Sequence, residues 1–216
     1  MSKNVIAVKG VPRELYQKVK AAAASLGIPV GKAVTEALEL WLGTRADNRV
    51  VELKRQLIEY LDRTISNGSS VLKERFFFKI YKQVLVGKRR CIVAHDVITS
   101  AINKRDPACS MIVRELIVGR SNLLISSLSV AISCDELIKG GLSDYAEKFV
   151  LALPGENLLV LDWKTFVNAI SLCKSLNIDF PYSIIVAHAK LYDINTVLSS
   201  DRAFDKTNLL RVDPLS

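Results

Sequence analysis

The sequence predicts an α/β protein with a helical N-terminal region, and three observations lead to this fold class. From Cys91 onward, short apolar stretches alternate with longer amphipathic stretches, as strands and helices do around a mainly parallel sheet. Before that point, residues 12–66 repeat their apolar positions at helical spacing. Half of the 216 residues are hydrophobic, which is enough for a proper core. One or two domains are therefore expected.

The pattern places each element in turn. A strand is expected at 4–10, and a helix that opens at Pro12 and stops at Gly27, since proline suits a first turn and glycine a C-terminus. A second helix starts near Pro29–Val30 and runs to Leu42. A polar helix at 45–66 and a phenylalanine-rich docking helix at 71–90 follow. The remaining strands are expected at 91–94, 122–126, 157–161 and 195–199, and the remaining helices at 107–119, 128–139, 143–152, 164–175 and 181–192.

The positive charge is concentrated in the first part of the chain. Residues 1–90 hold 18 Lys and Arg against 8 Asp and Glu, a net charge of +10, whereas residues 91–216 hold 12 against 14, a net charge of −2. A polyanion would therefore bind the N-terminal part first. A basic surface that only keeps the chain soluble is the alternative.

Several classes of protein are not indicated. The start of the chain shows no signal peptide, and the longest apolar stretches carry Ser and Asn and are too short to span a membrane. The four cysteines show no metal-binding or redox spacing and are expected as free thiols. We expect a cytoplasmic, nucleoid-associated protein without a membrane partner.

Residues 1–44 form the first predicted domain, and they are expected to dimerise. In the strand at 4–10, Ile6 and Val8 share one face, while Val5, Ala7 and Lys9 share the other. A strand and two amphipathic helices in so short a segment cannot bury both faces alone, but two copies can. A homodimer through this domain follows.

The segment "VIAVKGVPRELYQKVKAAAASLGIPVGKAVTEALELWL" (5–42) resembles the ribbon-helix-helix family of repressors and antitoxins. That resemblance implies double-stranded DNA as partner, with Val5, Ala7 and Lys9 facing the bases in the major groove. It also implies that the backbone amides of Val30, Gly31 and Lys32 meet phosphate. The chain departs from the family at Pro29, where Ser or Thr is usual, and in having one long polar reading residue, Lys9.

Residues 91–216 form a second predicted domain, joined to the first by a helical linker at 45–90. The stretches "CIVAHDVITSAI", "NLLISSLSVAISCDELIKGGLS" and "LNIDFPYSIIVAHAKLYDINTVLSSDRAF" resemble successive parts of PIN domains, over about residues 91–210. PIN domains are metal-dependent nucleases, so the resemblance implies carboxylates that hold Mg²⁺ or Mn²⁺ and activate water. Together the two domains resemble a VapBC-type toxin–antitoxin fusion.

The acidic positions of the PIN pattern are mostly replaced. The family's first Asp falls on Ala94, the acid of the central helix on Ile132, and the Asp of the late helix on Tyr182, while Asp201 is retained. We therefore expect no catalytic residue, no metal ligand and no cofactor. A displaced site is the alternative that would need Mg²⁺ or Mn²⁺; its members would be Asp96, Glu136, Asp179 and Asp201.

These observations lead to one preferred function and two alternatives. The preferred function is a DNA-binding protein, a transcriptional regulator derived from a fused toxin–antitoxin. Its inactive PIN-like domain either supplies assembly, with a higher oligomer as one form of it, or recruits another factor. The first alternative is a PIN ribonuclease that uses the displaced acidic site. The second is a chromosome-organising protein of low sequence specificity, favoured by the sparse reading face.

Overall fold

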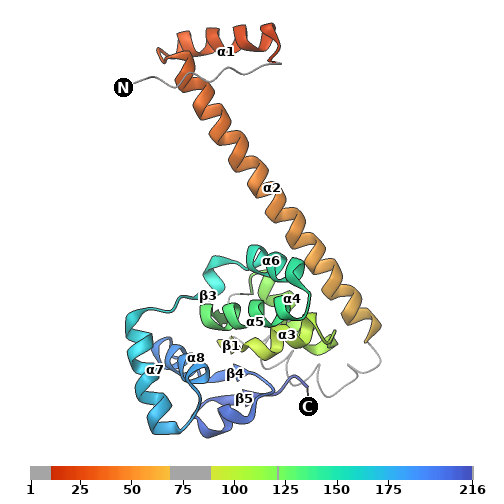
Figure 1. The fold of residues 1–216 in the computed structure, drawn as a ribbon, viewed down its shortest axis with the longest axis vertical. Coiled ribbons are helices and arrows are strands. Elements are labelled where there is room, and N and C mark those ends of the chain that lie inside the picture. The colour runs from red at the N-terminus through yellow and green to blue at the C-terminus, as the bar shows by residue number, and fades with distance from the viewer. Residues whose placement is uncertain (1–10, 69–88, 121, 216) are drawn as a thin grey trace. The chain divides into compact units, whose positions relative to one another are not determined.

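The computed structural model describes residues 11–68, 89–120 and 122–215 (Figure 1). The chain divides into two compact units, Met1–Arg49 and Val50–Ser216. The strand expected at 4–10, with Val5, Ala7 and Lys9, lies outside the described residues. So do residues 71–88 of the phenylalanine-rich stretch.

The first unit contains α1 (Arg13–Ser25) and the beginning of α2 (Val30–Asn67). Pro12 precedes α1, and Gly27 ends the following turn with a φ of +68°, a left-handed value that glycine adopts without strain. The amide of Ile28 then donates to the carbonyl of Ala23 at 3.0 Å, which closes the turn. The predicted start and end of this helix are confirmed.

The apolar side chains of the first unit lie mostly in solvent. Among its described side chains, Ala23 is the only one that is buried. Leu15 and Leu38 are each 53% exposed, and Leu26 is 73% exposed. The described part of this unit therefore has no closed hydrophobic core of its own.

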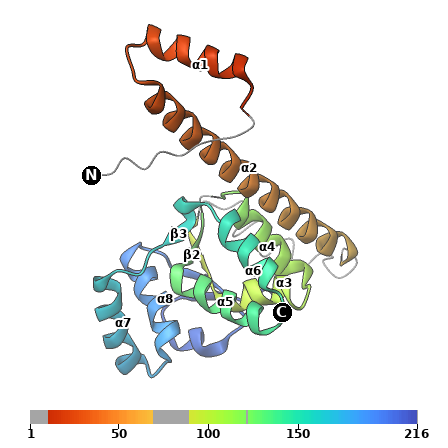
Figure 2. The ribbon, with the colours of Figure 1, turned by 45° about the horizontal axis from the view of Figure 1, so that its top comes forward.

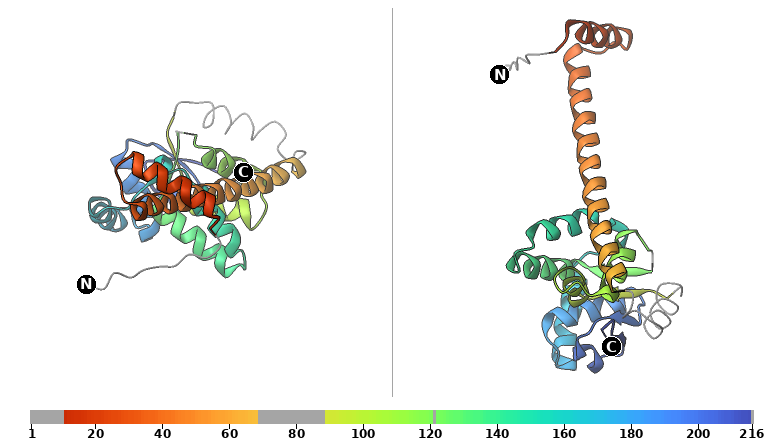
Figure 3. Two further views of the ribbon diagram at one scale, coloured as in Figure 1. Left: turned by 90° about the horizontal axis from the view of Figure 1, so that it is seen from above. Right: turned by 90° about the vertical axis from the view of Figure 1, so that its right-hand side faces the viewer.

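The helices expected at 30–42 and 45–66 belong to the single helix α2, which continues through Gly43 (Figure 3). From Val50 onward, α2 is part of the second unit. Leu57 and Leu61 are fully buried there and belong to its core. Residues Val50–Asn67, which the sequence analysis placed in a linker, thus contribute to the α/β unit.

The second unit is built on a five-stranded sheet in the order β3-β2-β1-β4-β5. Its strands are β1 (Cys91–Val93), β2 (Leu123–Ser126), β3 (Leu158–Leu159), β4 (Thr196–Leu198) and β5 (Leu210–Val212). All four neighbouring pairs are parallel, with Ile92 opposite Leu124 on one side and Val197 on the other. The predicted α/β class and parallel sheet are confirmed. Strand β5 was not predicted.

Helices cover both faces of this sheet (Figures 1 and 2). They are α3 (His95–Ile102), α4 (Pro107–Ile117), α5 (Ser127–Lys139), α6 (Ser143–Ala152), α7 (Trp163–Leu176) and α8 (Phe180–Leu191). Successive residues of β1 enter opposite cores: Cys91 and Val93 pack with α2 to α6, and Ile92 packs with α7 and α8. Strands buried on both faces explain the continuous apolar runs in the sequence.

The sequence analysis missed helix α3, which begins two residues after β1. Its sequence, "HDVITSAI", holds three β-branched residues in a row, Val97, Ile98 and Thr99, which favour a strand by propensity. All three are buried, so packing against the sheet decides the conformation instead. Within the described residues, no helix has both the length and the apolar character needed to cross a membrane.

Candidate functional site

Three chain segments meet at the carboxyl edge of the sheet. After β1 the chain enters α3, after β2 it enters α5, and after β4 it passes through Ser199–Asp201 into the 3-10 helix η3 (Arg202–Lys206). In a parallel sheet these strand ends lie together, and ligands of α/β proteins bind outside them. A displaced acidic site would therefore have to form at this edge of the sheet.

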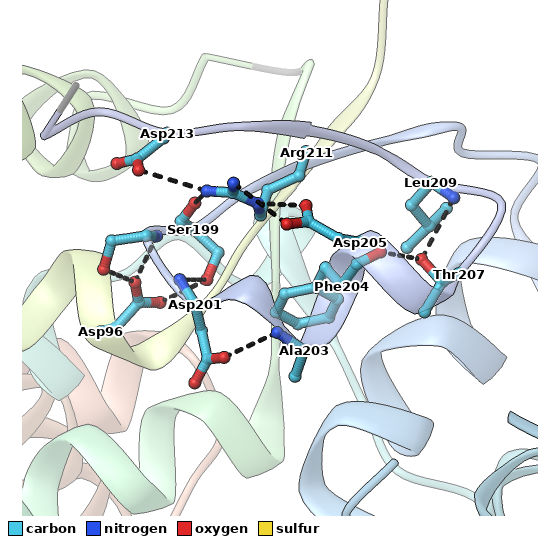
Figure 4. A network of polar contacts seen from close by, with 11 residues as sticks. Asp96, Ser199, Asp201, Ala203, Phe204, Asp205, Thr207, Leu209, Arg211 and Asp213 are labelled. Carbon is cyan, nitrogen blue, oxygen red and sulfur yellow. Dashed lines mark hydrogen bonds and ion pairs between the residues drawn. The ribbon is translucent and has the colours of Figure 1, made fainter. Parts of the chain in front are cut away.

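Asp96 occupies the second position of α3, and its carboxylate is bound to the segment that follows β4 (Figure 4). Its Oδ1 accepts a hydrogen bond from Ser199 Oγ at 3.0 Å. Its Oδ2 accepts from both the amide and the hydroxyl of Ser200, each at 2.7 Å. Both oxygens are thus engaged by three donors, and Asp96 holds α3 against the end of β4.

Asp201 has both carboxylate oxygens engaged as well. Oδ1 accepts from the amide of Ala203 at 2.8 Å and so caps η3 (Figure 4). Oδ2 accepts from the hydroxyl of Tyr182 on α8. The Tyr182 ring also packs edge-on against Phe204, with ring centroids 5.3 Å apart.

The surroundings of Tyr182 keep its hydroxyl protonated. Burial raises the pKa of Tyr182 above its usual value, and so do the hydrogen bond to Asp201 and the charges of Asp201, Asp96 and Asp179. Each of these effects disfavours a phenolate. Tyr182 is therefore a neutral donor, and three of the four acids of the displaced site help to raise its pKa.

Glu136 and Asp179 are placed differently. The Oε2 of Glu136, on α5, lies 2.8 Å from Thr99 Oγ1, and it shares with Asp96 the lining of an open cavity of about 370 Å³. Asp179 directly precedes α8, is exposed and makes no side-chain capping bond within the described residues. The structure thus brings Asp96 and Glu136 to one cavity and Asp96 and Asp201 to one loop, while Asp179 lines neither.

The other two replaced positions carry apolar side chains. Ala94, between β1 and α3, is fully buried and donates its amide to the carbonyl of Leu198 at 3.1 Å. Ile132 lies on α5 and is half-buried. Neither position offers an oxygen ligand from its side chain.

The acids that are present do not fit the Mg²⁺ or Mn²⁺ that the PIN resemblance implies. Such ions take several oxygen ligands at short range. Here the oxygens of Asp96 and Asp201 already accept hydrogen bonds from Ser199, Ser200, Ala203 and Tyr182. Across residues 11–68, 89–120 and 122–215, no three His, Cys, Asp or Glu side chains are placed to share a metal ion. We derive no metal-dependent step at this edge.

Arg211 of β5 contacts two acids and the loop after β4. The sequence analysis did not find this group. Arg211 Nε lies 2.6 Å from Asp205 Oδ1, and Arg211 donates from Nη1 to Asp213 Oδ2 at 3.2 Å and to the carbonyl of Ser199 at 3.4 Å (Figure 4). The hydrogen bond from Arg211 lowers the pKa of Asp205. The sequence alone does not show that these three charged residues interact. Their contacts depend on the pairing of β5 with β4, which brings Arg211 to the segment after β4.

The predicted phosphate-binding amides begin α2. Val30, Gly31 and Lys32 are its first three residues, where backbone amides lack an intrahelical acceptor. The Lys32 amide, however, donates to the carbonyl of Pro29 at 2.9 Å. The Lys32 side chain approaches Glu36 at 3.9 Å and is mostly exposed. The amides of Val30 and Gly31 are therefore better placed for an anion than that of Lys32.

Comparisons with known proteins assign no family to the chain. No model of a protein family matches it, and no curated protein matches it. Among solved structures, it is similar to a chain in the crystal structure of VapBC2 from Rickettsia felis bound to a DNA fragment from their promoter. The sequence identity is 17% and the TM-score is 0.45, over 57% of this chain and 97% of that chain.

Proposed function

We propose that the chain is a DNA-binding protein that acts as a homodimer through its N-terminal unit and whose α/β unit is not catalytic. The observation that carries the proposal is the exposed apolar surface of the first unit. Leu15 on α1, Leu26 just after α1 and Leu38 on α2 are each more than half exposed. A second copy that covers them would supply the core that the unit lacks.

The charge of the same region supports nucleic acid as partner. Residues 1–49 hold 8 Lys and Arg against 4 Asp and Glu, a net charge of +4, and Arg13, Lys18 and Lys20 are all exposed on α1. Phosphate contacts of this kind supply affinity, and base contacts supply specificity. The reading residues would be Val5, Ala7 and Lys9 of each copy, with the Val30 and Gly31 amides on phosphate.

We infer further that the protein is a transcriptional regulator derived from a fused toxin–antitoxin pair, with the α/β unit serving assembly. The engagement of Asp96 and Asp201 in hydrogen bonds favours this over a PIN ribonuclease. A chromosome-organising role remains the second candidate, because Val5 and Ala7 offer only apolar contacts to the bases. The cytoplasm and the nucleoid are the compartments that fit either role.

Dimerisation is tested by sedimentation equilibrium at micromolar concentration. We expect a dimer for the wild-type chain, and a monomer or an unfolded N-terminal unit for Leu15→Glu and Leu38→Glu. Ile138→Glu is the matched control, because Ile138 is 56% exposed on α5 of the other unit. A wild-type monomer with a folded N-terminal unit contradicts the proposal.

DNA binding is tested by fluorescence anisotropy with random and genomic duplexes at several salt concentrations. Affinity should fall steeply with salt because phosphate contacts release counterions. Lys9→Ala should cost about 1–3 kcal/mol per base contact, whereas Lys190→Ala, an exposed lysine of α8, should have no effect. A genome-wide binding profile then separates a regulator, with few sites, from an organiser, with many.

Catalysis is tested with structured and single-stranded RNA in the presence of Mg²⁺ or Mn²⁺. We expect no cleavage by the wild-type chain. Cleavage that disappears in both Asp96→Asn and Asp201→Asn would overturn the non-catalytic assignment and favour the displaced site of Asp96, Glu136, Asp179 and Asp201.

A further inference from the structure

A cleft with two arginines and two tyrosines lies in the α/β unit, away from the carboxyl edge of the sheet. Its volume is about 470 Å³. Tyr60, Arg63 and Asn67 line it from α2, Arg105 from the loop between α3 and α4, and Tyr145 from α6. Tyr60, Arg63 and Asn67 are three, four and seven residues apart, so they share one face of α2.

Within the described part of the chain, the side chains that line this cleft carry only positive charge. Arg63 and Arg105 are the only charged side chains among the described residues that line it. Both are exposed, and neither belongs to an ion pair within the described part of the chain. By contrast, Arg55 on α2 and Arg114 on α4 are each paired with an acid of α2. Two guanidinium groups that have no acidic partner among the described residues favour an anion at this cleft, and their planar donors match the oxygens of a phosphate.

An aromatic wall accompanies the charge. The rings of Tyr60 and Tyr145 have centroids 4.6 Å apart with an interplanar angle of 52°. The Tyr60 hydroxyl donates to the carbonyl of Ile102 at 2.7 Å, which fixes that ring. The guanidinium carbon of Arg105 lies 6.0 Å from the centroid of Tyr60. In proteins that bind nucleic acid strands, aromatic rings stack on the bases and neighbouring cationic groups bind the phosphates.

The backbone at Arg105 is held in an unfavourable conformation. Its φ is +54°, a left-handed value that side chains larger than glycine rarely adopt. The next residue fixes it there: the Asp106 amide donates to the carbonyl of Ser100 at 3.0 Å, and its carboxylate caps α4 through the Cys109 amide at 2.8 Å. Strained residues of this kind cluster at ligand sites, where the surrounding fold holds them ready.

We propose that this cleft binds a nucleotide, with Arg63 and Arg105 on its phosphate and the Tyr60–Tyr145 pair against its base. The volume lies within the range of small-ligand sites. The nucleotide is either a free mononucleotide or one unit of a single-stranded nucleic acid. The proposal is independent of DNA binding by the N-terminal unit, because every residue it uses lies in Val50–Ser216.

The test is isothermal titration of the full-length protein with AMP, ribose 5-phosphate, adenosine and the single-stranded oligonucleotide pA4. AMP should bind in the micromolar to millimolar range, and ribose 5-phosphate and adenosine should each bind more weakly. Arg63→Gln and Arg105→Gln should weaken AMP roughly tenfold or more, as the loss of a charge-assisted hydrogen bond does. Arg55→Gln is the matched control, two turns earlier on α2 and paired with Glu59. Circular dichroism checks that each variant is folded, and Arg63→Lys, which keeps the charge, should bind between wild type and Arg63→Gln.

The possible results separate the two sources. If pA4 binds more tightly than AMP with the same dependence on Arg63 and Arg105, the ligand is a nucleic-acid strand; if it binds no better, the ligand is a free nucleotide. Three results overturn the proposal. They are no binding of AMP or pA4, binding that survives both Arg→Gln changes, and displacement of AMP by a tetraglutamate peptide that binds the wild type more tightly.

Discussion

The Tyr182 hydroxyl donates a hydrogen bond to Asp201 Oδ2. Tyr182 stands where the PIN resemblance calls for an acid, and Asp201 is the acid that the chain retains. Both residues are therefore joined in a contact between α8 and η3. At the carboxyl edge of the sheet, these two residues thus connect α8 to the segment after β4.

Tyr182→Phe should lower the free energy of unfolding of the α/β unit by about 1–3 kcal/mol, because it removes the donor from a half-buried carboxyl acceptor. Urea unfolding followed by circular dichroism measures the change. Tyr192→Phe, at the end of the same helix with its side chain 40% exposed, is the control and should change stability by less than about 0.5 kcal/mol. Equal effects of the two variants would show that the Tyr182–Asp201 bond contributes little.

Asp96→Asn should destabilise the same unit by about 1–3 kcal/mol. The asparagine amide group would place donors against the Ser199 and Ser200 donors that the carboxylate accepts. The matched control is Asp135→Asn, since Asp135 pairs with the exposed Lys139 of the same helix; exposed pairs contribute about 0–1 kcal/mol. Thermal unfolding of both variants is the measurement. Stability gained by Asp96→Asn would mean that the site is an acidic cluster whose repulsion is relieved.

Leu57→Ala should cost about 2–5 kcal/mol, the usual cost of a cavity in a packed core. Leu57 lies on α2 and is fully buried in the core that contains β1 and α3 to α6. Val51→Ala, on the same helix with its side chain 65% exposed, should have almost no effect. Denaturant unfolding tests both. A neutral Leu57→Ala would show that α2 is not part of the folded α/β unit in solution.

Stability should fall as the pH drops below about 6.5. His188 is fully buried, and desolvation lowers its pKa, with the Val160 carbonyl and Asp162 opposing that effect. The unfolded chain therefore takes up a proton at a pH where the folded chain does not, and the free energy of unfolding decreases by up to about 1.4 kcal/mol per pH unit below that point. His188→Gln should flatten this slope between pH 7 and pH 5 in urea titrations. An unchanged slope would assign the acid sensitivity to other groups.

Most of the fold follows from local patterns in the sequence. The strands at 91–93, 123–126 and 196–198 and the helices from α4 to α8 lie where apolar periodicity and capping residues predict them. α3 and β5 do not, because burial overrides the strand propensity of Val97, Ile98 and Thr99, and because Leu210–Val212 becomes a strand only through its pairing with β4. Tertiary contact decides both elements.

The candidate site was predictable in part. The replacement of acids by Ala94, Ile132 and Tyr182 can be read from the sequence once the PIN resemblance is accepted. The partners of Asp96 cannot, because Ser199 and Ser200 lie 103 and 104 residues away and reach it only across the β1–β4 pair. The positions of Val5, Ala7 and Lys9 on DNA remain a prediction, since these residues lie outside the described ranges.

The two outer strands of the sheet leave little backbone free for pairing with another chain. β3 has two residues and β5 has three, and Arg211 in the middle of β5 is held by Asp205 and Asp213. Very short edge strands, and a charged residue within one of them, disfavour the side-by-side addition of strands by which sheets grow into aggregates. A second copy of the α/β unit would therefore meet the first through helix side chains, such as the exposed Trp163 and Val167 of α7, rather than through a shared sheet.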